Sequence, residues 1–135
     1  MVCAYHHYKS VNSGKSAIRI VRLTPGQDRY IPTFCVQCDN APCEISCPTK
    51  AISRKGPYLR ININLCINCK TCIEACPFGL MLYHKDSPTP IKCDLCEGDP
   101  QCVKYCPVDC LSFGDLDEKV WPKEILAFRL IGKEL

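Results

Sequence analysis

Cysteine is the residue type in this chain with the widest chemistry, because thiolates form disulfides and bind soft metal ions. The sequence has 14 cysteines in 135 residues, and so high a content in a short chain is typical of covalent or metal cross-links. Cys3 and Cys110 stand alone, whereas the other twelve form three groups that each end in a Cys-Pro pair. The groups are Cys35, Cys38, Cys43 and Cys47; Cys66, Cys69, Cys72 and Cys76; and Cys93, Cys96, Cys102 and Cys106.

Disulfides and zinc are the two plain alternatives for these groups. Small cysteine-rich chains are often secreted and disulfide-bonded, but the first ten residues have no apolar run and no twin arginine that would mark export. Zinc sites commonly join two CxxC pairs across a long loop to form a tetrahedron of four thiolates. The second group instead has its four cysteines within residues 66–76.

The spacing of the second group is CxxCxxCxxxCP, which is the bacterial ferredoxin signature for 4Fe-4S clusters. In that signature three thiolates bind one cluster and the fourth cysteine binds the neighbouring cluster. Three closely spaced sulfurs can cover one face of a cube, and the proline turns the chain away because it cannot continue a helix. The first and third groups are variants of this pattern, so the sequence predicts iron-sulfur clusters in preference to zinc.

The remaining composition excludes several function classes. Lys and Arg number 17 against 14 Asp and Glu, with no long basic run, which argues against nucleic acid as the main partner. No stretch approaches the 18 or more apolar residues of a transmembrane helix, and the absence of an export signal favours a cytoplasmic protein. We find no phosphate loop, no nucleophile beside a base and no nucleotide fingerprint, so we predict no catalytic activity.

Short elements are expected to position the cysteines. Alternating apolar residues predict a strand at 17–23 and hairpins at 51–63 and 80–92. Short helical turns are predicted at the end of each cysteine group, over residues 41–47, 71–76 and 101–106. The expected class is α+β and ferredoxin-like, with cluster-binding loops, short helices, small β-hairpins and little regular secondary structure.

The chain divides into two parts by composition. Residues 1–113 contain every cysteine and are predicted to form one domain with three 4Fe-4S sites. Residues 114–135 have no cysteine and several large apolar residues. We expect this tail either to cover the domain, since small domains need apolar cover, or to dock on a partner.

The residues around the cysteines resemble a known family. The first group reads CVQCDNAPCEISCP from Cys35, the second CINCKTCIEACPFG from Cys66, and the third begins KCDLC at Lys92 and ends at Cys106-Pro107. These segments are similar to the polyferredoxin electron-transfer subunits of multisubunit oxidoreductases. That family includes iron-sulfur subunits of the dimethyl sulfoxide reductase type and of tungsten-dependent aldehyde oxidoreductases.

The resemblance implies that the groups share ligands crosswise. It assigns the first cluster to Cys35, Cys38, Cys43 and Cys76, the second to Cys66, Cys69, Cys72 and Cys47, and the third to Cys93, Cys96, Cys102 and Cys3. In the competing scheme Cys106 completes the third cluster and Cys3 is free. The resemblance also implies that the first three cysteines of the family's N-terminal motif are missing, with Cys3 as its last. We expect Cys110 to pack as a small apolar residue.

The function implied by the resemblance is electron transfer. The chain would relay single electrons through three 4Fe-4S clusters between a larger catalytic subunit and another redox subunit or soluble ferredoxin. The catalytic subunit would be a tungsten or molybdenum pterin oxidoreductase working under anaerobic conditions. A free-standing polyferredoxin shuttle is the first alternative, and a structural zinc protein is the second.

The sequence alone leaves the roles of four basic side chains undecided. Lys70 and Lys92 adjoin predicted ligands, where a positive charge would raise a cluster's potential, but either lysine could equally be solvated. His6 and His7 are expected to lie in a loop as polar packing residues, with metal binding as the alternative.

Overall fold

The computed structural model of the chain describes residues 1–22 and 30–114, and all helices and strands in these ranges are short. The helices are α1 (Val2–Tyr8), α2 (Pro42–Ile45), α3 (Thr71–Glu74) and α4 (Gln101–Lys104), and the 3-10 turns are η1 (Ser13–Lys15) and η2 (Leu95–Gly98). The strands are β1 (Arg19–Arg22), β2 (Tyr30–Thr33), β3 (Ile52–Lys55) and β4 (Tyr58–Ile61). This confirms the predicted α+β, ferredoxin-like class with little regular secondary structure.

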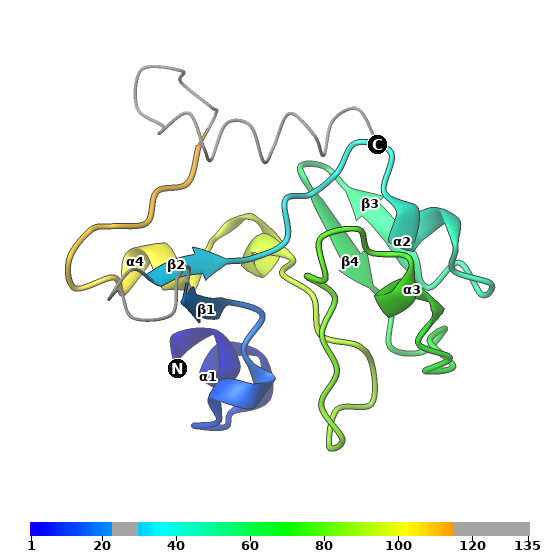
Figure 1. The fold of residues 1–135 in the computed structure, drawn as a ribbon, viewed down its shortest axis with the longest axis horizontal. Helices are drawn as coiled ribbons and strands as arrows, with labels where there is room; N and C mark the ends of the chain where they lie inside the picture. The colour runs from blue at the N-terminus through cyan, green and yellow to red at the C-terminus, as the bar shows by residue number, and fades with distance from the viewer. Residues whose placement is uncertain (23–29, 115–135) are drawn as a thin grey trace.

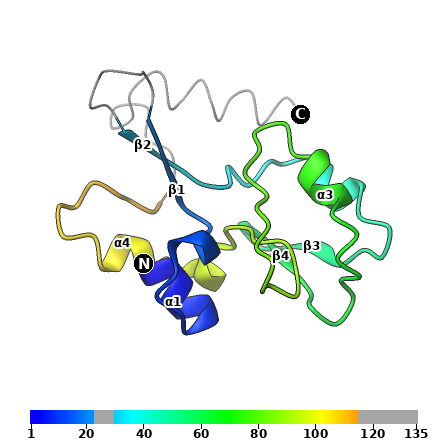
Figure 2. The same cartoon turned by 60° about the horizontal axis from the view of Figure 1, so that its bottom comes forward.

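The elements gather in two groups. The hairpin β3–β4 lies beside α2 and α3, and the pair β1–β2 lies with α1 and α4 on the opposite side of the molecule (Figures 1 and 2). Contacts between α2 and α3 and between α1 and α4 hold each group together, and η2 joins the groups by contacting β4. The three helical turns predicted at the ends of the cysteine groups are confirmed as α2, α3 and α4.

The first predicted hairpin is confirmed, and the second is reduced to one bridge. Strands β3 and β4 pair antiparallel, and Gly56 takes a φ of 60° in the turn between them, a backbone conformation that glycine adopts at little cost. In the second hairpin only Leu82 and Ile91 pair, through N–H···O bonds of 2.8 and 2.7 Å. Pro88 and Pro90 lie in the connection, and proline has no N–H with which to extend the ladder.

The strand predicted at 17–23 is present as β1, and its partner β2 was not predicted. The register pairs Arg19 with Thr33 and Ile20 with Pro32. Pro32 obscured the strand in the sequence, but a two-stranded sheet consists only of edges, where proline is tolerated.

Helix α1 corrects one prediction, since His6 and His7 lie in this helix and not in a loop. Its N-cap Met1 makes no side-chain cap, and Lys9 ends the helix with a φ of 50°. Helices this short depend on packing more than on propensity. Buried Cys3 and Ala4 supply that packing against the rest of the domain, which explains why no sequence signal marked the helix.

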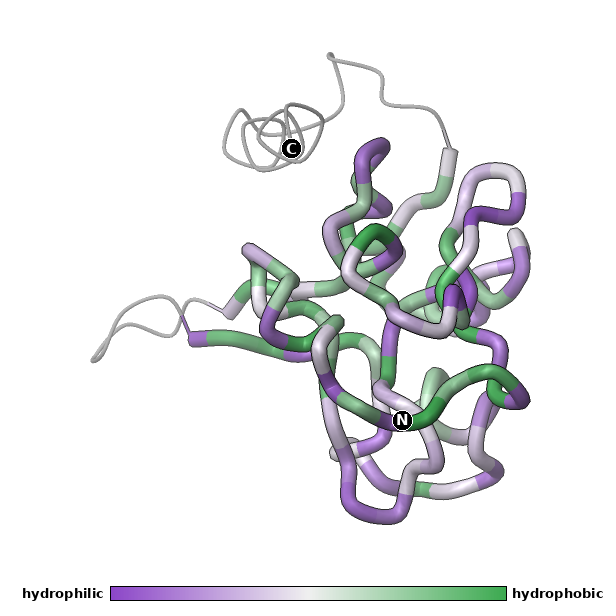
Figure 3. The backbone as a smooth tube through the Cα atoms, turned by 90° about the vertical axis from the view of Figure 1, so that its right-hand side faces the viewer, coloured by the Kyte–Doolittle hydropathy of each residue, from purple (hydrophilic) through white to green (hydrophobic). Residues whose placement is uncertain are grey.

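The hydrophobic core is small and includes the cysteines themselves. Cys43, Cys47 and Cys72 pack with apolar residues that include Leu59, and Cys3 packs with Ala17 and Ile91 in a second cluster. Leu59 and Ile91 are the largest fully buried side chains in the described ranges. Hydrophobic stretches along the backbone are short and interrupted by hydrophilic ones (Figure 3).

Two sequence predictions concern the chain beyond this core. Over residues 1–22 and 30–114 no helix has both the length and the apolar character needed to cross a membrane. The prediction for the tail lies outside the described residues from position 115 onward.

Candidate metal centres

The first candidate site, called the first site below, combines cysteines from two groups around one cavity. Cys35, Cys38 and Cys43 line it together with Cys76, the last cysteine of the second group. Cys43 lies on α2, and Cys76 follows α3. The contact between these helices therefore brings together the four thiols that the resemblance assigned to the first cluster.

The second site is the converse of the first. Its cavity is lined by Cys66, Cys69 and Cys72 of the second group and by Cys47 from the first. Cys72 lies on α3, and Cys47 follows α2. Each of the two groups thus contributes its last cysteine to the cavity of the other.

The third site takes its fourth thiol from the N-terminal helix. Cys93, Cys96 and Cys102 line its cavity with Cys3. Cys3 lies on α1 and Cys102 on α4, and the contact between these helices brings the two thiols to the same cavity. Cys106 does not line this cavity and lies with its Sγ 3.5 Å from that of Cys110.

The packing role expected for Cys110 is wrong. Cys110 is exposed, and Asp109 before it has a φ of 47°. This left-handed residue turns the chain after Pro107, so Cys110 faces Cys106 and not the core.

The same backbone turn recurs in all three groups. The residue before the second cysteine of each group has a positive φ: 55° at Gln37, 53° at Asn68 and 55° at Leu95. Left-handed backbone costs roughly 1–2 kcal/mol for a residue with a side chain, and such strain concentrates at functional sites. Only Asn68 is a residue type that favours this conformation, so the sequence did not indicate the repeat.

Backbone N–H groups point at the sulfurs that complete each site. The N–H groups of Ala51 and Leu80 donate to the Sγ atoms of Cys47 and Cys76 at 3.3 and 3.4 Å, each from four residues along the chain. Ala17 donates to Cys3 at 3.3 Å. Hydrogen bonds to cysteine sulfur are one of the features by which a protein tunes an iron-sulfur cluster.

Burial opposes ionisation of the inward-facing thiols. It raises the pKa of Cys43 and Cys72 to about 11 and that of Cys93 to about 12. At exposed Cys69 the hydroxyl of Thr71 donates to Sγ at 3.4 Å and lowers the pKa of the thiol. A metal that binds these groups must displace protons from the buried thiols.

The donor set fits iron-sulfur clusters better than single ions. Thiolates suit both zinc and iron-sulfur clusters, but four sulfurs around one zinc at 2.3 Å lie roughly 3.8 Å apart. Within the part of the chain that the structure describes, the one set of three or more donor atoms mutually within 4.8 Å is His6, His7 and Cys96. In the described residues the sulfurs around each cavity are therefore not gathered as the four ligands of one zinc ion would be.

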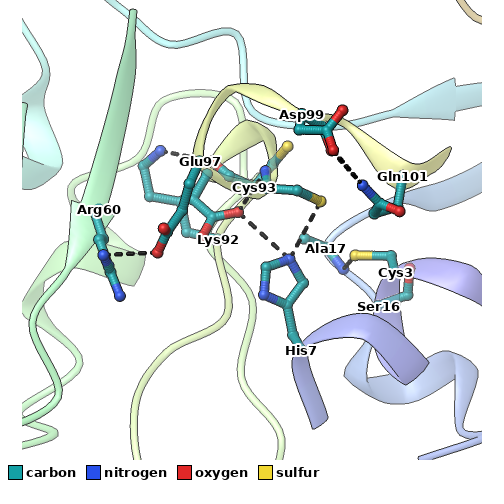
Figure 4. Close-up of polar contacts among 12 residues, drawn as sticks. Cys3, His7, Ser16, Ala17, Arg60, Lys92, Cys93, Glu97, Asp99 and Gln101 are labelled. Atoms are coloured by element: carbon teal, nitrogen blue, oxygen red, sulfur yellow. Dashed lines mark hydrogen bonds and ion pairs between the residues drawn. The ribbon is translucent and has the colours of Figure 1, made fainter. Parts of the chain in front are cut away.

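The histidines lie beside the third site. His7 Nε2 is 3.6 Å from the Sγ of Cys96 and 3.4 Å from Oδ1 of Asp94. Figure 4 shows the His7 ring with dashed lines to a sulfur and to an oxygen atom. Burial lowers the pKa of His7 although Asp94 acts in the opposite direction. His7 therefore contacts a predicted ligand, which the sequence alone did not indicate.

The two lysines left open by the sequence differ sharply. Lys70 is exposed, with Nζ 4.0 Å from the centroid of the Tyr83 ring. Lys92 is buried and makes three hydrogen bonds, one of them to the backbone of Cys93. The Oε1 of Gln37 accepts another of these bonds. The sequence did not predict a role for Gln37.

Known proteins resemble this chain over most of its length. Residues 27–116 match the family model described as the 4Fe-4S dicluster domain. The chain is 37% identical over 120 residues to an uncharacterized ferredoxin of Methanocaldococcus jannaschii, covering 88% of this chain and 70% of the relative. It is 39% identical over 98 residues to the B subunit of the polysulfide reductase of Wolinella succinogenes, covering 66% and 51%.

A third relative has a similar description. The chain is 35% identical over 108 residues to the polyferredoxin-like subunit of the aliphatic sulfonate oxidoreductase of Pyrococcus furiosus, covering 78% of this chain and 61% of that subunit. This chain therefore spans less than two thirds of the two named oxidoreductase subunits.

Proposed function

Because this chain belongs to the 4Fe-4S dicluster domain family, we propose that it is an electron-transfer subunit with three 4Fe-4S clusters. A 4Fe-4S cluster held by four thiolates takes up and returns one electron at a time. The first, second and third sites would each hold one cluster, with the ligands that line their cavities. The count of three and the ligand sets are our proposal, since the family description names two clusters.

The observation that supports this proposal most strongly is the partition of the thiols. Twelve cysteines fall four to a cavity, and every cavity takes its fourth thiol from outside its own group. Exchange of the fourth ligand between two motifs is the bacterial ferredoxin arrangement. The sulfurs are not gathered as zinc ligands would be, which argues against the structural zinc alternative.

The order of the sites along the molecule supports a linear path. The first and second sites share the helix pair α2 and α3. Lys92 lines the first cavity and directly precedes Cys93 of the third. The first site thus has a neighbour on each side, and we propose that electrons pass through it between the second and third sites.

A catalytic partner follows from the relatives and the resemblance. Two of the relatives are named as subunits of an oxidoreductase. We propose that this chain likewise serves a larger catalytic subunit, which by the family resemblance binds tungsten or molybdenum pterin. The chain itself is assigned no catalytic residue, and its redox partner on the far side is another redox subunit or a soluble ferredoxin.

A reductive titration tests the relay. Protein purified without oxygen should accept about three electrons per chain, one for each cluster, as counted by stepwise addition of dithionite with absorbance and electron paramagnetic resonance readouts. Two electrons per chain would limit the chain to two clusters, and none would remove the electron-transfer function.

A further inference from the structure

Lys92 is a buried cation with a complete set of acceptors. Its residue is 9% exposed. Nζ donates to the carbonyl of Cys93 at 2.9 Å, to Oε1 of Gln37 at 3.1 Å and to the carbonyl of Leu59 at 3.3 Å. An ammonium has three N–H groups and a neutral amine has two, so three acceptors match the charged form.

Gln37 fixes the place of this ammonium. Its Nε2 donates to the carbonyl of Cys93 at 2.8 Å, and its Oε1 accepts from the N–H of Leu59 at 3.0 Å. Gln37 is the left-handed residue of the first cysteine turn. Lys92 is therefore tied to the turn of the first site, to strand β4 and to the turn of the third site.

Lys92 lies between the first and third sites. It lines the first cavity together with Cys35, Cys38, Cys43 and Cys76. Its Nζ donates to the backbone carbonyl of Cys93, a proposed ligand of the third site, at 2.9 Å. Lys92 is not among the residues that line the second cavity, whereas Lys70 is.

We infer that Lys92 is a buried cation shared by the first and third sites, which raises the reduction potentials of both. The inference rests on the proposed function, because it requires clusters at both sites. Reduction adds one electron to a site, with no bond or proton changed, and so makes the site more negative by one charge. A buried positive charge stabilises the more negative state more strongly, so removal of the charge of Lys92 should lower the reduction potentials of these two sites.

Replacement of Lys92 by glutamine tests this role. Lys92→Gln removes the charge but keeps an N–H donor for the acceptors that the ammonium would otherwise leave unpaired. In a redox titration followed by electron paramagnetic resonance, two of the three reduction steps should move to lower potential and one should stay. We expect at least a tenfold weaker reduction constant for each of the two, which is ~59 mV for a one-electron couple.

Lys70→Gln is the matched control, because Lys70 lines the second cavity but is exposed. Lys70→Gln should move at most one reduction step, and the shift in potential should be smaller than in Lys92→Gln, since water screens an exposed charge. The inference is overturned if Lys92→Gln leaves all three reduction steps in place, or if it moves only one step or all three. It is also overturned if the shifts in potential are no larger than those of Lys70→Gln.

A second variant decides the matter if Lys92→Gln does not retain its iron. Gln37→Met keeps the ammonium but removes the acceptor that fixes its place. The charge should then act less strongly on the two sites, so the same two reduction steps should move to lower potential by a smaller amount. No change in either step would overturn the inference. Zinc in the wild-type protein would instead refute the proposed function, and fewer than three reduction steps would refute the proposed set of three clusters; iron analysis of every sample separates these failures from a failure of the inference.

Discussion

Cysteines three positions apart have opposite environments in this chain. Cys69 is exposed and receives the hydroxyl of Thr71, which lowers the pKa of its thiol, whereas burial raises the pKa of Cys72 to about 11. Buried thiols of this kind keep their protons at neutral pH until a metal displaces them. Loading of the sites should therefore release protons.

Chemical labelling of the loaded protein separates free thiols from ligands. We expect iodoacetamide to modify Cys106 and Cys110 under anaerobic conditions and to leave Cys3 unmodified, because of these three only Cys3 lines the third cavity. Mass spectrometry of the digested protein gives the modified positions. Labelling of Cys3 with protection of Cys106 would reverse the assignment of the fourth ligand.

The pH dependence of the same labelling has a defined sign. Backbone N–H groups, that of Val108 foremost, lower the pKa of Cys106, whereas the neighbouring Cys106 raises the pKa of Cys110. The thiolate is the reactive form, so Cys106 should begin to react at lower pH than Cys110. Equal pH profiles for the two labelling rates would contradict the difference in pKa.

Serine substitution tests the third site through its iron content. Cys3→Ser should lower the iron content toward about 8 atoms per chain, and Cys106→Ser should leave it near 12, because each site would hold four irons. Anaerobic metal analysis of both variants, each against the wild-type protein, gives the result. Unchanged iron in Cys3→Ser together with loss in Cys106→Ser would favour the competing scheme.

The sequence predicts candidate ligands but not the residues that contact them. CxxC spacing and the Cys-Pro pairs are local signals that predicted the twelve cysteines of the three groups as ligands, whereas the prediction for Cys3 came from the family resemblance. Lys70 and Lys92 are equivalent in such signals, since each adjoins a predicted ligand. The contact of Lys92 with Gln37 spans 55 positions, and only the fold brings these residues together.

At the scale of elements, short helices position the thiols in pairs. α2 and α3 carry Cys43 and Cys72, and α1 and α4 carry Cys3 and Cys102. The helical turns beside the Cys-Pro pairs and the hairpin of β3 and β4 were predictable, because prolines and a glycine turn mark their limits. α1 was not predictable, since its stability comes from the packing of Ala4 and Cys3 against distant residues.

A paired substitution on α1 tests whether this helix holds the third site. Ala4 is fully buried and Tyr5 is 58% exposed. Ala4→Glu forces an unpaired carboxylate into the core, at a cost of several kcal/mol, and should cost the protein about one third of its iron. Tyr5→Glu adds the same side chain at the surface and should retain all of it, as measured by iron per chain. Equal iron contents in the two variants would show that α1 does not support the site.

At the scale of the whole molecule, the candidate metal sites would take the place of a large core. Leu59 and Ile91 are the largest fully buried side chains in the described ranges, and buried cysteines fill positions that apolar residues hold in most domains. Metal binding in such proteins contributes to folding itself. The same groups that stabilise the fold would therefore form the electron path.

Partner binding distinguishes the subunit from a free-standing shuttle. We expect an affinity-tagged chain, expressed anaerobically in its native host, to co-purify in constant ratio with a larger polypeptide that contains tungsten or molybdenum. Gel filtration with metal analysis of the fractions checks this. Elution of the iron-loaded chain as a monomer without either metal would favour the shuttle.

Iron and acid-labile sulfide per chain test the central claim most directly. Anaerobically purified protein should contain about 12 iron and 12 sulfide per chain, as three 4Fe-4S clusters require. About 8 of each would remove the third site from the account, and tightly bound zinc without sulfide would contradict the account as a whole.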